Sequence, residues 1–189
     1  MDFFIVDNFL LKEQCNSLIA LSEALGYKEA DISFPEGGKM IKEYRNNFRV
    51  LYSDENFREE LEKTIIRYAP KKLSIIQEGG TVKEVEFLKL SGNFRFYKYL
   101  PGQKFKKHRD GNKEEEGGVS RITVLIYLNS VGDKSGGGTN LCDFSLGGNR
   151  IIQPSAGRLL LFDHSLMHIG EELLDGVKYV LRSDLIYNG

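Results

Sequence analysis

The chain has 189 residues, of which 41% are hydrophobic and 28% are charged, and its formal net charge is −1. This length fits one domain with a sizeable hydrophobic core. A chain so close to neutrality gives no global electrostatic reason to bind nucleic acid or a membrane surface. No apolar run approaches a membrane span, the N-terminus lacks a signal-peptide pattern, and two cysteines are too few for a disulfide framework. We therefore expect a soluble cytoplasmic protein, and nothing in the sequence indicates an oligomeric state.

Two helices are predicted in the N-terminal part. Apolar residues recur at helical spacing over residues 11–25, and Gly26 is placed to end that helix. A second helix begins near Asp54, which can cap it, and ends before Pro70. Between these helices, residues 44–52 have the pattern of a strand.

From about residue 83 the pattern changes to short strands separated by glycine-containing turns. The clearest predicted strands are residues 85–88, 93–100, 121–129, 158–163 and 177–187. Antiparallel strands in two facing sheets form a jelly roll, which can hold a metal in its mouth. We therefore expect a mainly β fold with N-terminal helices. One domain over residues 1–189 would have helical support at about 8–82 and a jelly-roll core at about 83–188.

The three histidines of the chain suggest a metal site. His108 and Asp110 form an H-x-D triplet, and residues i and i+2 of a strand point the same way. His164 and His168 lie downstream as candidates for a third ligand. Two imidazoles and one carboxylate leave three open positions on the metal, which is typical of non-haem Fe(II) oxygenases. A zinc-dependent hydrolase is the alternative, but it needs a general base near the metal, and we find none placed near either motif.

Five motifs around these histidines occur in a defined order. They are Tyr99-Leu100-Pro101-Gly102 leading to His108-Arg109-Asp110, then Ile126-Tyr127-Leu128-Asn129, Gly136-Gly137-Gly138-Thr139, the strand 157–162 leading to His168-Ile169-Gly170, and residues 176–182. This series resembles the catalytic domain of the prolyl 4-hydroxylase-like Fe(II)/2-oxoglutarate oxygenases, over roughly residues 85 to 188. The resemblance implies a double-stranded β-helix, which is the family's form of the jelly roll.

The resemblance also assigns the metal ligands. His108 and Asp110 match the family's H-x-D ligands. His168 matches the distal ligand better than His164 does, because it is followed by Ile-Gly. Related halogenases replace the carboxylate of the triplet by a small residue, so the presence of Asp110 favours hydroxylation over halogenation.

A cosubstrate site is implied in the same way. Lys178 matches the basic residue that pairs with the C5 carboxylate of 2-oxoglutarate, and Tyr99 and Thr139 match residues of the same pocket. A dicarboxylate needs a cation at its far end, which agrees with this role for Lys178. The alternation of the strand 121–129 predicts that Tyr127 points inward, near the cosubstrate.

Arg182 lies on the same strand face as Lys178, four residues along the chain. Three roles are open for it. It could replace Lys178 as the cosubstrate anchor, contact an acidic substrate, or pair with Asp184.

The reaction that the resemblance implies is hydroxylation of an unactivated C–H bond, coupled to decarboxylation of 2-oxoglutarate to succinate. Fe(II), 2-oxoglutarate and O2 would take part, with ascorbate as a reductant. The substrate would be a small molecule such as an amino acid, or a peptidyl side chain such as proline. Candidate substrate contacts are Arg45, Asn47 and Arg95, and a locally basic segment before the H-x-D triplet hints at an anionic substrate. A non-catalytic jelly-roll binding module is the remaining alternative, and the joint presence of the three ligands and Lys178 argues against it.

Overall fold

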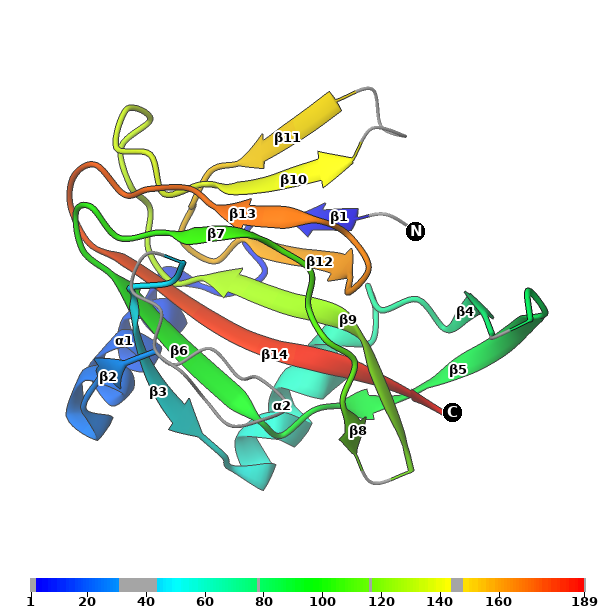
Figure 1. The fold of residues 1–189 in the computed structure, drawn as a ribbon. Coiled ribbons are helices and arrows are strands. Elements are labelled where there is room, and N and C mark those ends of the chain that lie inside the picture. The colour runs from blue at the N-terminus through cyan, green and yellow to red at the C-terminus, as the bar shows by residue number, and fades with distance from the viewer. Residues whose placement is uncertain (1–2, 31–43, 78, 116, 144–147, 189) are drawn as a thin grey trace.

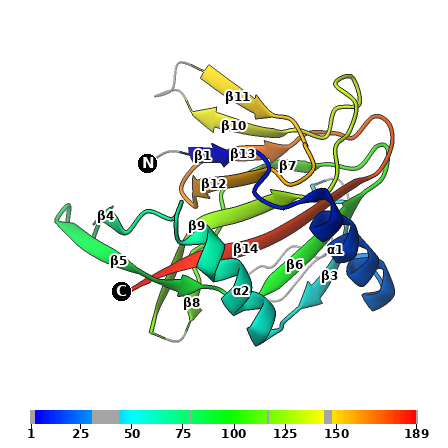
Figure 2. The ribbon, with the colours of Figure 1, turned by 180° about the vertical axis from the view of Figure 1, so that it is seen from behind.

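The computed structural model describes residues 3–30, 44–77, 79–115, 117–143 and 148–188. Two antiparallel sheets face each other, and two helices cover the outer face of the larger sheet (Figures 1 and 2). The predicted double-stranded β-helix with N-terminal helices is confirmed. Within the described ranges, no helix combines the length and the apolar character needed to cross a membrane.

The larger sheet contains ten strands. In spatial order its main path is β1 (Phe3–Val6), β12 (Leu159–Asp163), β9 (Gly118–Tyr127), β14 (Lys178–Asn188), β6 (Phe94–Tyr99), β3 (Phe48–Tyr52) and β2 (Lys28–Glu29). Beside this path, β8 (Glu114–Glu115) pairs with β9, β5 (Val82–Leu90) pairs with β14, and β4 (Lys72–Ile76) pairs with β5. The last strand of the chain, β14, therefore lies in the middle of the sheet, between β9 and β6.

The smaller sheet has four strands and lies above the larger one in Figure 1. Its order is β11 (Gly148–Ile152), β10 (Thr139–Asp143), β13 (His168–Gly170) and β7 (Phe105–His108). The strands β13 and β7 pair directly although about 60 residues of chain separate them. This pairing brings two distant histidines together at the opening between the sheets.

Strand alternation divides the side chains of the larger sheet between two cores. On β14, Leu181 and Leu185 pack in the core under the helices, while Val180 packs in the core between the sheets. On β9, Ile122 and Val124 belong to the first core in the same way. Successive residues of a strand point to opposite faces, so polar residues at the intervening positions face the smaller sheet. This is the predicted alternation of both strands.

Both predicted helices are present. The first, α1 (Lys12–Leu25), ends at Gly26, whose φ of 80° lies in the left-handed region that favours glycine. The second, α2 (Glu55–Ile65), begins after Asp54, whose carboxylate accepts a hydrogen bond of 2.8 Å from the Phe57 backbone N–H. Gly26 therefore sets the end of α1, and Asp54 sets the start of α2, as the sequence predicted.

The N-terminal segment supplies strands as well as helices. The strand predicted over residues 44–52 begins only at Phe48, and before it Arg45 forms an isolated bridge with Phe105 of the smaller sheet. The strand β3 pairs with β6, and β1 pairs with β12, so both lie in the larger sheet. These strands satisfy backbone groups that β12 and β6, at the two edges of the β12–β9–β14–β6 core, would otherwise expose.

Candidate metal centre

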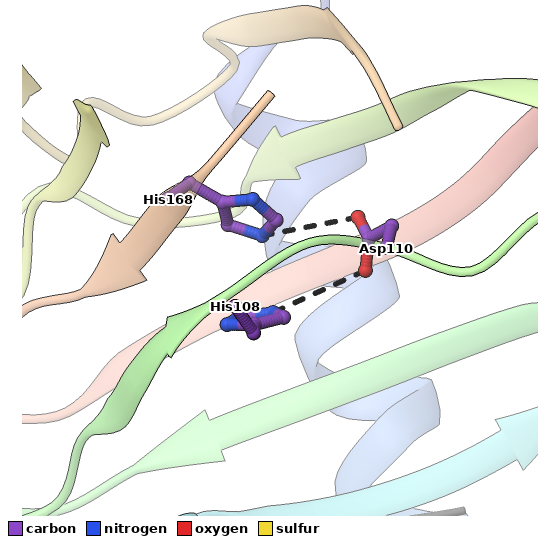
Figure 3. Close-up of side chains that lie close together, drawn as sticks. All are labelled: His108, Asp110 and His168. Carbon is purple, nitrogen blue, oxygen red and sulfur yellow. Dashed lines mark ion pairs between the residues drawn. The ribbon is translucent and has the colours of Figure 1, made fainter. Parts of the chain in front are cut away.

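Three side chains at the mouth of the jelly roll form a compact cluster. His108 ends β7, Asp110 follows two residues later, and His168 begins β13 opposite His108. Their candidate ligand atoms all lie within 4.8 Å of one another. The Nε2 atoms of His108 and His168 lie 4.0 Å and 3.8 Å from the two oxygens of Asp110 (Figure 3). The structure therefore brings together the three residues predicted as metal ligands.

Backbone carbonyls orient both imidazoles. The Nδ1 atom of His108 lies 2.8 Å from the carbonyl oxygen of Lys106, and that of His168 lies 3.0 Å from the carbonyl oxygen of Leu166. A carbonyl oxygen only accepts, so each Nδ1 carries the proton and each Nε2 keeps its lone pair for a metal. The ring of Phe105 stacks on His108 with centroids 3.6 Å apart, which restricts the ring further.

The protonation states of the three groups suit metal binding. Burial and the neighbouring His168 lower the pKa of His108 to about 3, with Asp110 opposing the shift. Burial also lowers the pKa of His168. Burial acts to raise the pKa of Asp110, but Arg182 and the histidines outweigh it, and the pKa lies below its ordinary value. At neutral pH the cluster thus offers two neutral imidazoles and one carboxylate, and this donor set fits Fe(II).

Asp110 is held on two sides. Thr123 donates a hydrogen bond of 2.6 Å to its Oδ2 atom, and the Nη2 atom of Arg182 lies 3.0 Å from the same oxygen. The same Nη2 atom lies 3.1 Å from Asp184. Of the three roles open for Arg182, the structure shows the pairing with Asp184 and adds a contact with Asp110.

The other histidine, His164, lies outside the cluster. It is buried, and its Nε2 atom lies 3.2 Å from Asp184. The described residues group His168, and not His164, with His108 and Asp110. The choice of His168 over His164 therefore agrees with the geometry.

A cavity of about 590 Å³ opens beside the cluster. Its size lies in the range of small-molecule sites, roughly 300–1,000 Å³. The cluster residues, the inward faces of β6 and β14, and part of β9 line it. It therefore has room for molecules beside a metal.

Lys178, Tyr99 and Thr139 line this cavity. Lys178 is 2% exposed, donates a hydrogen bond of 2.7 Å to the Gly137 carbonyl, and lies 3.9 Å from the centre of the Tyr99 ring. Burial lowers the pKa of Lys178 to about 7, and Glu171 opposes this shift. Tyr127 does not line the cavity. It is fully buried and donates a hydrogen bond of 2.6 Å to the hydroxyl of Thr139, which itself lines the cavity.

The three predicted substrate contacts take different positions. Arg45 lines the cavity, and its Nε atom donates a hydrogen bond of 2.7 Å to the side-chain oxygen of Asn47. Asn47 is fully buried and does not line the cavity. Arg95 lines the cavity and lies 3.0 Å from the carboxylate of Asp184. The sequence reasoning missed Thr123 as a partner of Asp110, although strand alternation placed it inward, and missed Phe105, for which the sequence carries no signal.

Comparison with known proteins identifies the family. Residues 94–183 match the model of the 2OG-Fe(II) oxygenase superfamily, and this range contains all three residues of the cluster and Lys178. Residues 94–183 form a 2OG-Fe(II) oxygenase domain. The prediction of an Fe(II)- and 2-oxoglutarate-dependent dioxygenase is thereby confirmed, with Fe(II) as its metal and with 2-oxoglutarate and O2 as cosubstrates. Ascorbate stays a prediction.

Solved structures share the fold at low sequence identity. A Trichoplax adhaerens prolyl hydroxylase in complex with a hypoxia-inducible factor peptide is 17% identical, with a TM-score of 0.73 over 98% of this chain and 83% of that one. A collagen prolyl hydroxylase of Paramecium bursaria Chlorella virus-1, in complex with 2-oxoglutarate, is 17% identical, with a TM-score of 0.62 over 98% and 96%. Streptomyces hygroscopicus HygX, with nickel, 2-oxoglutarate and hygromycin B bound, is 12% identical, with a TM-score of 0.62 over 100% and 83%. Among curated protein sequences, none matches the chain.

Proposed function

We propose that this oxygenase hydroxylates a C–H bond of a small molecule or a peptidyl side chain, and that His108, Asp110 and His168 hold its Fe(II). The observation that carries the proposal is the convergence of two imidazole nitrogens and a carboxylate within 4.8 Å, at a cavity that Lys178 also lines. Fe(II) bound there would activate O2 and couple the decarboxylation of 2-oxoglutarate to oxidation of the substrate. We treat residues 1–189 as one catalytic domain, because strands from both parts of the chain pair in one sheet.

Lys178 is our candidate for the anchor of the 2-oxoglutarate C5 carboxylate. It forms no ion pair with a carboxylate of the described residues, so its charge is available to a ligand, whereas Arg182 already contacts Asp110 and Asp184. The hydroxyl groups of Tyr99 and Thr139 would supply further donors beside it. Tyr127 would act indirectly, by fixing the hydroxyl of Thr139.

Arg182 would position the metal ligand Asp110. A charged partner and the Thr123 hydroxyl, both on the Oδ2 atom, restrict the carboxylate and keep it ionised. A zinc-dependent hydrolase with the same ligands would leave a buried lysine in the cavity without a role. This observation favours the oxygenase reading of the site over the hydrolase.

The substrate of the enzyme is a molecule that fits beside the metal in the same cavity. Among the similar structures, the Trichoplax enzyme is in complex with a peptide and HygX has hygromycin B bound. Proteins that share a fold can act on different substrates. We therefore propose that the cavity takes a small molecule or a side chain of a peptide, and that ascorbate serves as reductant.

The proposal can be tested without knowledge of the substrate. Fe(II) and then 2-oxoglutarate are added to the protein in the absence of oxygen, and the weak visible charge-transfer absorption of the chelated cosubstrate is recorded. We expect the absorption in the wild-type protein and not in Asp110→Ala, with an unchanged circular dichroism spectrum in the variant. Absence of the absorption in the wild-type protein, together with tight zinc binding, would refute the proposed function.

A further inference from the structure

Arg45 is buried at the cavity in a fixed orientation. The residue is 6% exposed, and its guanidinium lies between the rings of Tyr97 and Phe105, 4.6 Å and 4.5 Å from their centres. The hydrogen bond from its Nε atom to Asn47 fixes the rotation of the planar group. A guanidinium held this way keeps the rest of its donors in a defined geometry.

One of those donors has no partner. The Nη2 atom of Arg45 is buried and makes no hydrogen bond to any described residue. Arg45 also forms no ion pair with a carboxylate in the described part of the chain. Buried guanidinium donors are nearly always satisfied, because leaving one unpaired costs free energy. The missing acceptor is therefore expected from a molecule that enters the cavity.

The side chains that line the cavity carry a net positive charge, which favours the binding of an anion. Apart from Arg49, six basic side chains line it, against two carboxylates among the lining residues described. Both carboxylates are already in ion pairs with Arg182, and Asp184 also pairs with Arg95. The charges of Fe(II) and the 2-oxoglutarate dianion cancel each other. The positive excess would thus remain after both have bound.

The cosubstrate does not account for Arg45. In the proposed function, one carboxylate of 2-oxoglutarate would pair with Lys178, and the other end of the molecule would bind the metal. The register of the sheet pairs Lys178 with Tyr99, whereas Arg45 stacks on Tyr97, one strand repeat further along β6. Arg95, another cation, occupies the next inward position on that strand. The cations therefore extend along β6 beyond the cosubstrate anchor.

We propose that the substrate of this enzyme carries a carboxylate group and that Arg45 binds it. This inference rests on the proposed function and names the substrate class of the same site. A guanidinium remains charged at any physiological pH and matches the geometry of a carboxylate, so it discriminates an acid from the corresponding neutral amide. The carboxylate belongs either to a free acid or to a peptide.

The test measures binding without turnover. The protein is loaded with Mn(II) and 2-oxoglutarate, and calorimetry gives the Kd of L-amino acids and simple carboxylic acids, each compared with its primary amide. Short peptides with free and amidated C-termini form a second arm, which separates peptide from free-acid substrates. We expect at least one acid to bind about tenfold or more tightly than its amide, the effect of one charge-assisted hydrogen bond.

Two variants and a control assign the effect to Arg45. Arg45→Gln should weaken binding of the preferred acid about tenfold or more, and Arg45→Lys, which keeps the charge but not the planar fork, should lose less. Arg150→Gln removes an exposed arginine of β11 that does not line the cavity and should change nothing. In Arg45→Gln, the Kd of 2-oxoglutarate for the Fe(II) protein should stay within about threefold of the wild-type value, a difference of about 0.6 kcal/mol. This Kd is read from the visible absorption of the complex.

The inference and the proposed function fail in different ways. If 2-oxoglutarate binds but acids and amides bind equally, or if no acid binds, the inference is overturned while the proposed function stands. If Arg45→Gln weakens 2-oxoglutarate as much as it weakens the acid, Arg45 belongs to the cosubstrate site and the inference is again overturned. If the wild-type protein does not bind 2-oxoglutarate at all, both fail.

Discussion

Arg182 lies between two carboxylates, with its Nη2 atom 3.0 Å from Oδ2 of Asp110 and 3.1 Å from Oδ1 of Asp184. Asp184 in turn contacts Arg95 and His164. Burial opposes ionisation of each of these carboxyl groups, but Arg182 together with the other neighbouring groups outweighs it and keeps both pKa values below their ordinary range. A buried network of alternating charges thus connects a candidate metal ligand to the middle of the larger sheet.

Removal of this arginine should weaken metal binding. We expect Arg182→Gln to lower the Fe(II) affinity roughly 10- to 100-fold, the usual effect of losing an outer partner of a metal ligand. The measurement is competition with a chelator under anaerobic conditions. Arg95→Gln is the matched control, because Arg95 contacts Asp184 but not Asp110. Equal losses in the two variants would show that the charge of the network, and not the contact with Asp110, matters.

The cosubstrate anchor can be assigned by a second pair of variants. Lys178→Met should raise the Kd of 2-oxoglutarate about 10- to 100-fold, because a charge-assisted hydrogen bond to the carboxylate is lost. Arg182→Gln, measured at saturating Fe(II), should have a much smaller effect on this Kd. The visible absorption of the Fe(II) complex reports both values. The opposite ranking would make Arg182 the anchor.

The low pKa of Lys178 predicts a pH dependence of cosubstrate binding. The value of about 7 results from burial, with Glu171 opposing it. Below pH 7 the lysine is charged and attracts the carboxylate, whereas above pH 7 binding must first protonate the amine. The Kd of 2-oxoglutarate should therefore be level below about pH 7 and rise up to about tenfold per pH unit above it.

Lys178→Arg is the control for this titration. An arginine at this position stays charged over the whole range, so the rise of the Kd above pH 7 should disappear even if the affinity is lower. The upper end of this titration, about pH 9, lies well above the pKa of Lys178. If the wild-type Kd stays level from pH 6 to about pH 9, the assignment of Lys178 is contradicted.

The hydrogen bond of Tyr127 should matter more for stability than for binding. Tyr127→Phe removes the donor to Thr139 and should lower the free energy of unfolding by about 0.5–1.5 kcal/mol. The Kd of 2-oxoglutarate should change less than threefold, or by about 0.6 kcal/mol, because the phenol does not reach the cavity. Denaturant unfolding and the visible titration measure the two effects. A large loss of cosubstrate affinity at normal stability would place Tyr127 in the site itself.

Local patterns in the sequence predicted the helices, the main strands and the H-x-D pair, while the family resemblance implied the double-stranded β-helix and the choice of His168 as third ligand. Alternation along 121–129 and 177–187 identified the inward faces of β9 and β14, and the caps at Gly26 and Asp54 set the helix ends. The spacing of His108 and Asp110 depends only on the two-residue repeat of extended chain. These features are local, so they are present in the sequence before any long-range pairing forms.

Only the tertiary structure decided which distant groups meet. The pairing of β7 with β13 selects His168 over His164, and the path of the chain before β3 brings Arg45 against Phe105. The contact of Arg182 with Asp110 likewise joins two distant parts of the chain, whereas its contact with Asp184 lies within β14. Such pairings are set by packing between segments far apart in the chain, and a pattern within one segment carries no information about its partner. The sequence by itself determined the chemistry that this site can perform, while the packing of the sheets decided which side chains surround it.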